Sequence, residues 1–600
     1  MATRLENYAF IGDLRTAAVV SRDGSVDWWS VPRFDSQACF SALVGSGKDG
    51  RWSLAPAWNG HATEWRYRDD SLVMETVFEV AAGRVRVTDA MPLGCEQPTI
   101  LRVVSGLAGR VTMRTECRPR FYYGRLNGWK RGHGRELFAV GGPDAVVLRS
   151  SIELRWDDDG ATGEFTVAEG ETVTFALSWY PSHQEPPRPL DAAGEIERCD
   201  AWWRAWAERC VYEGPWREAV VRSAITLKAL TYAQTGAIVA AVTSGLPEQI
   251  GGDKNWDYRF CWLRDSSFTA IALLNLGYVD EARALLAWFF RMCADDPAKL
   301  QIMYQVTGER RLVDEKLAWL SGYEGSQPVR RGNAAATQFQ LGVYGQVITA
   351  FESAQRHGVD IDRDAWDTVC KLLEFIEESW RKPGAGFWES RAGGREYTDS
   401  KVMCWAAFDR ALRLAENVPF EAPREHWEQM RARIGRQVLT NGFDVDRNSF
   451  TQHYGSQELD ATALLFPAFG LLPYDDPRMR VTVNALESEL IHGGFLYRYS
   501  KDVTEDGSVG TPAEGAFIAC NFWLASYYAL AGRRSDAERL FEKLLAIRGG
   551  VGLLSEEYDT KDRRLLGNLP QALSHVGLIQ TAVVLARNHS PLETAAAAEA

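Results

Sequence analysis

The chain has 600 residues, a formal net charge of −13 at pH 7 and a pI near 5.4. This length is too great for one compact core, so we expect two or more domains. The acidic balance, without a cluster of lysines and arginines, excludes a positive field for nucleic-acid phosphates or anionic lipid. The first residues lack the pattern of a signal peptide, and no apolar run is long enough to cross a bilayer. We therefore predict a cytoplasmic protein without nucleic-acid or membrane partners.

From the start to about residue 180, short β-rich runs alternate with turns, as in residues 72–80, 84–88 and 171–177. This pattern is typical of an antiparallel β-sandwich, which we assign to residues 1–185.

A proline-dense segment follows at residues 181–189, and then an amphipathic stretch that carries Trp202, Trp203 and Trp206. We interpret residues 186–214 as a linker with a helix that docks one domain on the other.

From about residue 216 the apolar period becomes helical, and we predict twelve helical segments. Their approximate starts are Trp216, Asp265, Asp280, Ala334, Asp362, Ser400, Arg424, Glu458, Asp476, Glu514, Arg534 and Asn568. A closed ring of six helical hairpins, an (α/α)6 barrel, would bury the apolar stripes of these helices around one core, and we predict it for residues 215–592. An open solenoid is the alternative, although the helix pairs show no consensus repeat. We predict that residues 593–600 form a disordered tail.

The loops that enter the even-numbered helices are long and rich in aromatic and charged residues, whereas the others are mostly short and plain. If the helices alternate in direction, the six long loops open at one end of the barrel. These loops are residues 255–265, 322–333, 386–391, 453–457, 510–514 and 552–559. From them we take as candidate substrate-binding residues Tyr323, Arg330, Asn333, Arg391 and Glu514.

Two of these loops carry a candidate catalytic carboxyl group. In glycoside hydrolysis a neutral acid protonates the leaving oxygen, while an ionised carboxylate acts as nucleophile or activates water. Glu389 follows Phe387 and Trp388, which would desolvate it and raise its pKa, so it is the candidate acid. Glu556 has polar neighbours and is the candidate for the carboxylate that stays ionised.

Each of these residues also has a structural interpretation. A loop glutamate such as Glu389 is often a solvated charge or an ion-pair partner. Asp265 is equally compatible with a helix cap, and Arg264 with an ordinary ion pair. The ten cysteines and nine histidines show no metal-ligand spacing, so we predict no structural metal and no cofactor, and we leave the oligomeric state open.

At the candidate residues the chain resembles glycoside hydrolase family 15, which contains glucoamylases, glucodextranases and prokaryotic trehalases. Residues 11–18 and 21–28 resemble the start of its prokaryotic members, and residues 262–265 (WLRD) resemble its sugar-binding W-x-R-D motif. Residues 387–389 (FWE) are similar to its general-acid segment. Residues 555–559 (SEEYD) are similar to the fungal S-E-Q-Y-D, whose first glutamate is the base.

The resemblance implies an N-terminal β-sandwich, a helical linker and an (α/α)6 barrel that cleaves an α-glucoside with inversion. It implies that Glu389 is the general acid and Glu556 the general base, with their carboxyl groups about 6.5–9.5 Å apart to leave room for a water. It also implies that the first glucose is bound by Trp262, Arg264, Asp265 and Trp388.

This chain departs from the family pattern beside the acid. Fungal glucoamylases have a second glutamate there that binds the leaving sugar, whereas this chain has Ser390 and Arg391. Gly342 and Gln346 stand where many prokaryotic relatives have acids. The leaving-sugar site therefore differs from the family pattern.

The expected partner is a small sugar, and the resemblance favours α,α-trehalose, because the prokaryotic trehalases share the length, the N-terminal segment and the two-domain layout. A glucoamylase-type exo-hydrolase of maltooligosaccharides or isomalto-linked glucosides is the main alternative. A non-catalytic sugar-binding protein and a phosphorylase on the same kind of barrel are further alternatives, and the presence of Glu556 argues against the phosphorylase.

Overall fold

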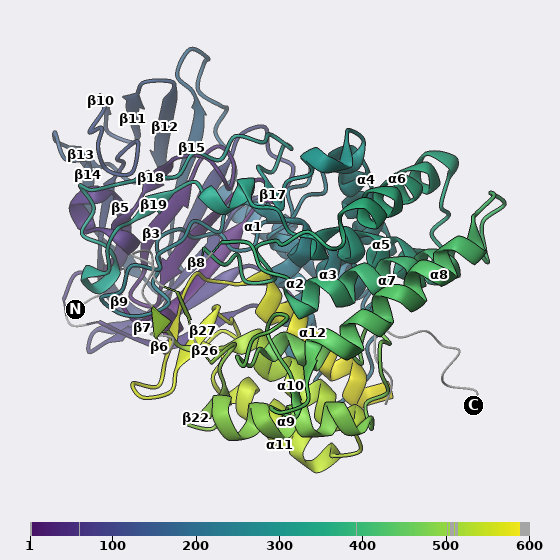
Figure 1. Cartoon of the computed structure of the whole chain (residues 1–600). Helices are drawn as coiled ribbons and strands as arrows, with labels where there is room; N and C mark the ends of the chain where they lie inside the picture. The colour runs from purple at the N-terminus through teal and green to yellow at the C-terminus, as the bar shows by residue number, and fades with distance from the viewer. Residues whose placement is uncertain are drawn as a thin grey trace.

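The computed structural model describes residues 3–58, 60–391, 393–500, 502–503, 509–510 and 514–587. It has a β-rich part, which begins the chain, and a helical part, which follows it (Figure 1). The predicted class, an N-terminal antiparallel β domain followed by an (α/α)6 barrel, is confirmed. The predicted tail at residues 593–600 lies outside the described residues.

The β domain is antiparallel throughout its fifteen described strands. These are β1 (Tyr8–Gly12), β2 (Ala17–Ser21), β3 (Ser25–Ser30), β4 (Ala38–Phe40), β5 (Arg51–Pro56), β6 (His61–Tyr67), β7 (Met74–Val80), β8 (Gly83–Ala90), β9 (Thr99–Arg118), β10 (Trp129–His133), β11 (Glu136–Gly141), β12 (Asp144–Ser150), β13 (Arg155–Trp156), β14 (Ala161–Ala168) and β15 (Thr172–Pro181).

The 20-residue strand β9 joins the two layers of this domain. Its first half pairs with β8 and β15, and its second half pairs with β5 and β14. The halves meet near Gly106 and Gly109, where the backbone of neighbouring segments approaches so closely that a Cβ atom at Gly106 would lie 1.9 Å from the Ala168 carbonyl oxygen. Glycine at these positions lets one strand serve both sheets.

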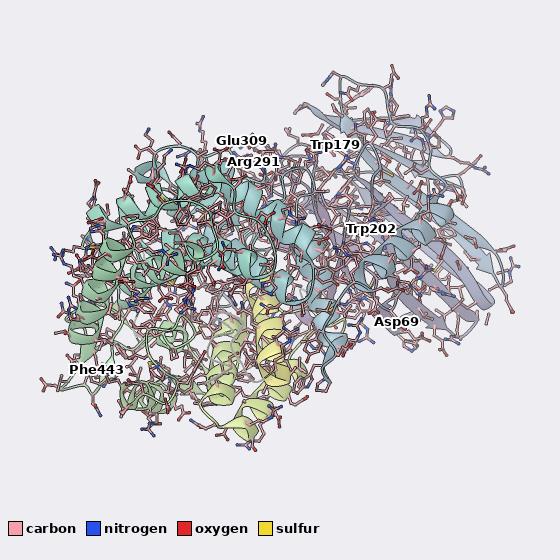
Figure 2. All side chains as sticks on the ribbon, turned by 90° about the vertical axis from the view of Figure 1, so that its right-hand side faces the viewer. Asp69, Trp179, Trp202, Arg291, Glu309 and Phe443 are labelled. Atoms are coloured by element: carbon pink, nitrogen blue, oxygen red, sulfur yellow. The ribbon has the colours of Figure 1, made fainter. Side chains whose placement is uncertain are left out.

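Helix α1 (Ala192–Ala207) packs between the β domain and the barrel. Trp203 and Trp206 are buried on it, and the Trp206 ring stacks on Tyr278 with the ring centroids 4.1 Å apart. Trp202, on the same helix, stays 38% exposed at the junction of the two parts (Figure 2). Aromatic packing by α1 therefore fastens the barrel to the sandwich.

The barrel consists of an inner ring of helices and an outer layer. The inner helices are α3 (Leu263–Asn275), α5 (Gly342–Arg356), α7 (Thr398–Leu414), α10 (Ile518–Leu530) and α12 (Ala572–Arg587). The outer helices are α2 (Arg217–Ala229), α4 (Val279–Cys293), α6 (Arg363–Ser379), α8 (Arg424–Gln437), α9 (Pro477–Leu490) and α11 (Arg534–Ala546). The inner helices are buried on almost every side, whereas most outer helices bury only one stripe, as a ring closed around one core requires.

Two of the predicted helix starts are wrong. At Glu458 the structure has only a 3₁₀ turn, η8 (Ala461–Leu465), which packs on α10 in the sixth inner position. Pro467 follows two residues after this turn, and it lacks the N–H that a continuing helix would need. At Ala334 there is likewise a short 3₁₀ turn, and α5 begins eight residues later.

The long loops lead into the inner positions of the barrel, and four of the six supply residues to one cavity at that end, as predicted. Short strand pairs support several of these loops, among them β26 (Ala516–Phe517), β27 (Glu557–Asp559) and β28 (Arg564–Leu566). Within the described ranges, no helix is long and apolar enough to span a membrane.

Candidate active site

The loops that enter the inner helices enclose a cavity of about 100 Å³. Eight of the eleven predicted site residues line it: Glu389, Glu556, Trp262, Arg264, Asp265, Trp388, Asn333 and Arg391. The two candidate catalytic carboxyl groups, 167 positions apart in the sequence, are thus brought to one cavity.

Glu389 lies in the loop between α6 and α7, in a left-handed backbone conformation with φ of 54°. The Gln338 side-chain amide donates to its carbonyl oxygen at 3.0 Å, which stabilises this conformation. Its carboxylate binds Arg264 at 2.8 Å, and 22% of the side chain remains exposed. Burial raises the pKa of Glu389, the nearby Asp265 charge adds to this, and Arg264 opposes it. The pKa of Glu389 is therefore shifted upwards, the direction predicted for it from the sequence.

Trp388 is fixed by packing and by one polar contact. Its ring meets Phe517 and Trp523 at centroid distances of 5.1 and 6.0 Å. Its Nε1 donates to Asp460 at 3.0 Å, at the start of η8. The aromatic wall beside the acid is thus rigidly oriented.

The residues of the W-x-R-D segment form the inner end of the cavity. Arg264 bridges the carboxylates of Asp265, at 3.0 Å, and Glu389. Asp265 Oδ1 and Trp262 Nε1 are buried, and neither has a hydrogen-bond partner among the described residues. Buried polar atoms are normally satisfied, so an acceptor and a donor without partners indicate a site that binds hydroxyl groups of a ligand.

Glu556 lies on the opposite loop, directly before β27. The Tyr258 hydroxyl donates to its Oε1 at 2.6 Å, and the Ile518 N–H donates to its carbonyl oxygen at 3.0 Å. Gly567, with φ of 75°, packs against it so closely that a Cβ atom there would lie 2.7 Å from the Glu556 Cβ. The loop that carries Glu556 is therefore fixed on several sides.

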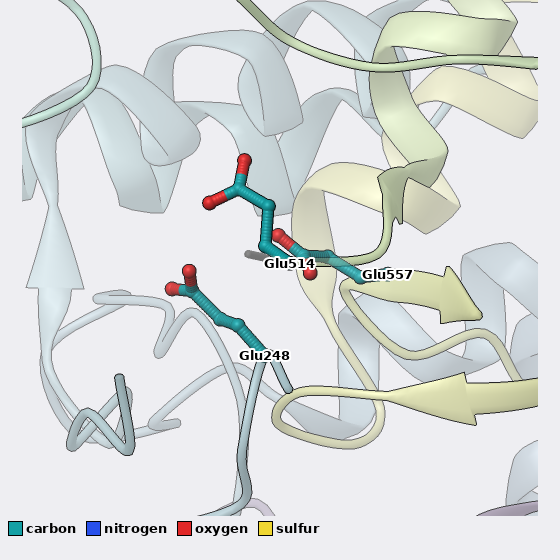
Figure 3. A group of neighbouring side chains, drawn as sticks. All are labelled: Glu248, Glu514 and Glu557. Carbon is teal, nitrogen blue, oxygen red and sulfur yellow. The ribbon is translucent and has the colours of Figure 1, made fainter. Parts of the chain in front are cut away.

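Three further carboxyl groups converge on one another (Figure 3): Glu248, Glu514 and Glu557. The charges of Glu248 and Glu514 act on Glu556. Their oxygens lie within 4.8 Å of one another, a spacing that suits a bound cation. Two basic side chains already bind them, because Arg498 contacts Glu514 at 2.6 Å and Glu248 at 2.8 Å, and Lys254 contacts Glu514 at 2.7 Å. We therefore interpret the group as a charge cluster and assign no metal to it.

The electrostatics of this cluster differ from the expectation for Glu556. Burial, followed by the charge of Glu248, raises the pKa of Glu556 well above its usual range, and burial with the charges of Glu514 and Glu248 does the same for Glu557. Glu514 goes the other way: although burial opposes it, Arg498 and Lys254 lower its pKa to about 2. The polar sequence neighbours of Glu556 therefore do not set its pKa: burial and the charge of Glu248 raise it, so Glu556 becomes ionised only at a higher pH than an ordinary glutamate.

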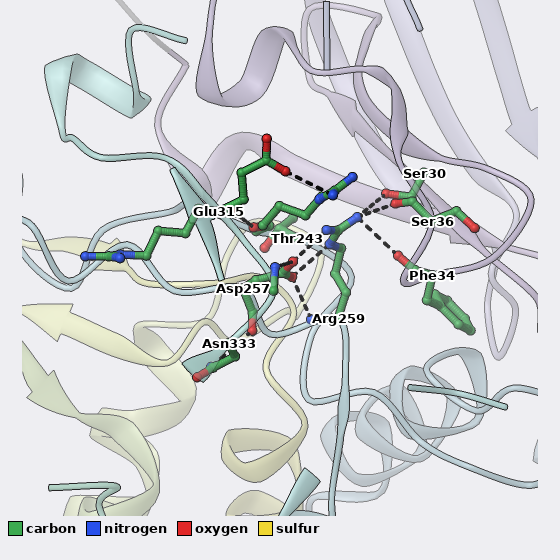
Figure 4. Close-up of polar contacts among 12 residues, drawn as sticks. Ser30, Phe34, Ser36, Thr243, Asp257, Arg259, Glu315 and Asn333 are labelled. Carbon is green, nitrogen blue, oxygen red and sulfur yellow. Dashed lines mark hydrogen bonds and ion pairs between the residues drawn. The ribbon is translucent and has the colours of Figure 1, made fainter. Parts of the chain in front are cut away.

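The β domain holds the loop that carries Tyr258 (Figure 4). The neighbouring Arg259 is fully buried and binds Asp257 through Nε at 2.8 Å. It also donates to the Tyr123 hydroxyl at 2.7 Å and to Ser30 Oγ at 3.1 Å, both in the β domain. Because residues 257–259 are consecutive, these contacts fix Tyr258 and, through it, Glu556.

Three predicted substrate-binding residues do not line this cavity. Tyr323 lies against the N-terminal segment of the chain, where its hydroxyl donates to the Thr3 carbonyl oxygen at 2.8 Å. Arg330 pairs with Asp314 at 3.4 Å and supports the Trp256 ring, with its Cζ 4.9 Å from the ring centroid. Glu514 belongs to the charge cluster and lines a neighbouring cavity.

Sequence reasoning did not single out several residues that line the cavity, among them six with polar or aromatic side chains: Glu248, Lys254, Trp256, Tyr258, Arg498 and Gln571. Trp256 and Tyr258 belong to the aromatic-rich loop 255–265, whose composition was a usable signal. The other four come from segments that carry no distinctive pattern.

Two carboxyl groups, an aromatic wall and unsatisfied polar atoms around one cavity of an (α/α)6 barrel define a glycosidase site. The sequence profile of glycosyl hydrolases family 15 matches residues 214–583, and that of the trehalase-like N-terminal domain matches residues 1–174. The chain belongs to glycosyl hydrolase family 15.

Similar proteins include two curated enzymes. The chain is 36% identical to a trehalase of Mycobacterium tuberculosis, over 97% of this chain and 90% of that protein. It is 34% identical to a trehalase of Thermoplasma volcanium, over 96% and 93%. A bacterial glucoamylase solved in complex with acarbose shares the fold, with a TM-score of 0.67, 14% identity, and coverage of 98% of this chain and 95% of that one.

Proposed function

We propose that this protein is a trehalase that hydrolyses α,α-trehalose to two glucoses with inversion at the anomeric carbon. The observation that carries the proposal is that Glu389 and Glu556 line one cavity together with the W-x-R-D residues. The similarity of nearly the whole chain to curated trehalases supports the choice of substrate.

Glu389 acts as the general acid. It donates its proton to the glycosidic oxygen as the bond from that oxygen to C1 breaks, so that the leaving glucose departs neutral. Burial holds the proton on Glu389 before the reaction, and Arg264 stabilises the carboxylate that remains afterwards.

Glu556 acts as the general base. It accepts a proton from a water molecule, and the resulting hydroxide attacks C1 from the side opposite the leaving group, which inverts the anomeric configuration. The Tyr258 hydroxyl, 2.6 Å from Oε1, orients the carboxylate. Because the pKa of Glu556 is raised, activity should fall on acidification already above the usual glutamate range.

The first glucose occupies the inner end of the cavity. Asp265 Oδ1 accepts from a sugar hydroxyl, and Trp262 Nε1 donates to another, which satisfies two atoms that have no partner within the described part of the chain. Trp388 forms an aromatic wall beside the ring.

The main alternative is a glucoamylase-type exo-hydrolase on the same residues. Glucose release from trehalose, maltose, maltotriose and isomaltose at equal concentration distinguishes the two, with the anomer followed by NMR. We expect release chiefly from trehalose, with β-glucose in excess in the first minutes. Release mainly from the maltosides or isomaltose would instead establish the glucoamylase-type activity, and binding of sugar without release would establish a sugar-binding protein.

A further inference from the structure

The loop of the general acid runs from the interior of the barrel to the mouth of the cavity. Phe387 is buried, Glu389 is half-buried and Arg391 is exposed. At the inner end, Trp262 and Asp265 are 4% and 2% exposed. A disaccharide whose first glucose fills the inner end must therefore place its second glucose beside the residues that follow the acid.

At that outer position Arg391 lies over Trp256. The guanidinium carbon is 4.1 Å from the ring centroid, and both residues line the cavity. Arg330 also contacts this ring, at 4.9 Å, but does not line the cavity. We interpret Arg330 as a support from behind and Arg391 as the cation on the cavity side.

Asn333 completes this part of the wall. It is 5% exposed, and its side-chain oxygen accepts from the Ala335 N–H at 3.0 Å, which fixes the amide. The wall therefore presents a guanidinium fork stacked on an indole and a fixed amide, which suits a polyhydroxylated ring.

We propose that Arg391, held on Trp256, forms the binding subsite for the leaving glucose and determines the preference for a disaccharide. Its fork donates hydrogen bonds to hydroxyls of the second glucose, and its place over the indole keeps a longer chain from stacking there. This inference rests on the proposed function, because it takes the second glucose of trehalose as the ligand.

The test compares α,α-trehalose with α-D-glucosyl fluoride, which carries the same first glucose but no leaving sugar. In its hydrolysis the C1–F bond breaks, water adds at C1, and fluoride and a proton are released. Arg391→Ala should lower kcat/KM for trehalose by about 10- to 100-fold, as expected for the loss of a charged hydrogen-bond donor. It should change kcat/KM for the fluoride by less than about twofold, because the acid, the base and the first subsite are intact.

Arg395→Ala is the matched control, since Arg395 is an exposed arginine of the same loop that does not line the cavity. It should leave both substrates unaffected. Arg391→Lys, which keeps the charge but loses the fork, should give an intermediate loss on trehalose. Equal losses on both substrates, or no loss on trehalose, would overturn the proposal.

Failure of the proposed function gives a different result. A wild-type enzyme that cleaves the fluoride and maltose but not trehalose would refute the trehalase assignment. The Arg391 variants would then be compared on maltose and the fluoride, and the same selective loss would still support a leaving-sugar subsite.

Discussion

The acid side and the base side of the cavity position their carboxyl groups in different ways. Glu389 lies on one strained loop, beside an aromatic wall and a single arginine. Glu556 lies directly before the strand pair of β27 and β28, beside three more carboxyl groups and two cations. Burial is the main cause that raises the pKa of both carboxyl groups, but Arg264 opposes it most strongly at Glu389, whereas the charge of Glu248 reinforces it at Glu556.

Replacement of either carboxyl group should have the largest effect. Glu389→Gln and Glu556→Gln remove the transferable proton and the proton acceptor, so we expect kcat on trehalose to fall by at least about 10³-fold. Glucose binding, measured by calorimetry, should persist in both variants because the first subsite is unchanged. Either variant with near wild-type kcat would remove that residue from the mechanism.

Gly567→Ala tests the rigidity of the base side. The added Cβ would lie 2.7 Å from the Glu556 Cβ, at a position with φ of 75°, so Glu556 must move. We expect a loss of kcat of roughly 10- to 100-fold, because a 1 Å misplacement of a reacting group has an effect of that size. Gly532→Ala is the control, since it has a similar φ of 82° but no atom within 4 Å of the added Cβ. Equal kcat in the two variants would show that the contact with Glu556 is unimportant.

Glu248→Gln tests whether the pKa of Glu556 can be changed without changing the pKa of Glu389. Glu248 raises the pKa of Glu556, so its neutralisation should lower that pKa and move the acid limb of the kcat/KM profile to lower pH. The basic limb, which reports Glu389, should not move. A shift of both limbs, or a shift of the acid limb to higher pH, would contradict the separate tuning of the two groups.

His575 should affect the stability of the protein on acidification. It is buried behind the base loop, where its Nε2 accepts from the Leu554 N–H at 3.2 Å and its Nδ1 faces Ser223 Oγ at 3.0 Å. Burial lowers its pKa to about 3, so it stays neutral in the fold while the unfolded chain binds a proton below its ordinary pKa of about 6.5. Stability is therefore lost as pH falls from about 6.5 towards 3, by at most about 1.4 kcal/mol per pH unit.

Thermal unfolding of the wild type and of His575→Gln between pH 7 and pH 4 measures this contribution. The variant should be less stable at pH 7 but should lose stability less steeply on acidification. Identical slopes would show that His575 does not contribute to acid sensitivity.

Much of the fold followed from the sequence. The change from β-rich runs to a helical period predicted the sandwich and the barrel, and the contrast between plain and aromatic loops placed Glu389 and Glu556 at one end. The helix predicted from Glu458 is only a 3₁₀ turn, and the helix predicted from Ala334 begins at Gly342, because apolar spacing alone does not show where helical hydrogen bonding starts or stops.

The charge cluster was beyond prediction from local sequence. Glu248, Arg498 and Glu557 lie far apart in the chain and have no shared motif, so only the closed barrel brings them together. The pKa of Glu556 depends on that assembly, which explains why its polar neighbours in the sequence indicated the wrong environment.

The buried Arg259 limits which β domains this barrel can be combined with. Its guanidinium is neutralised by a carboxylate of the barrel, but its remaining donors are satisfied by groups of the β domain. A barrel grafted onto a different sandwich would keep the buried Arg259 charge but lose the Ser30 and Tyr123 oxygens that accept its hydrogen bonds. This loss would fall next to Tyr258, which orients Glu556. The barrel therefore depends on this particular β domain. A chimera with a different sandwich would have to keep Ser30 and Tyr123 to remain active.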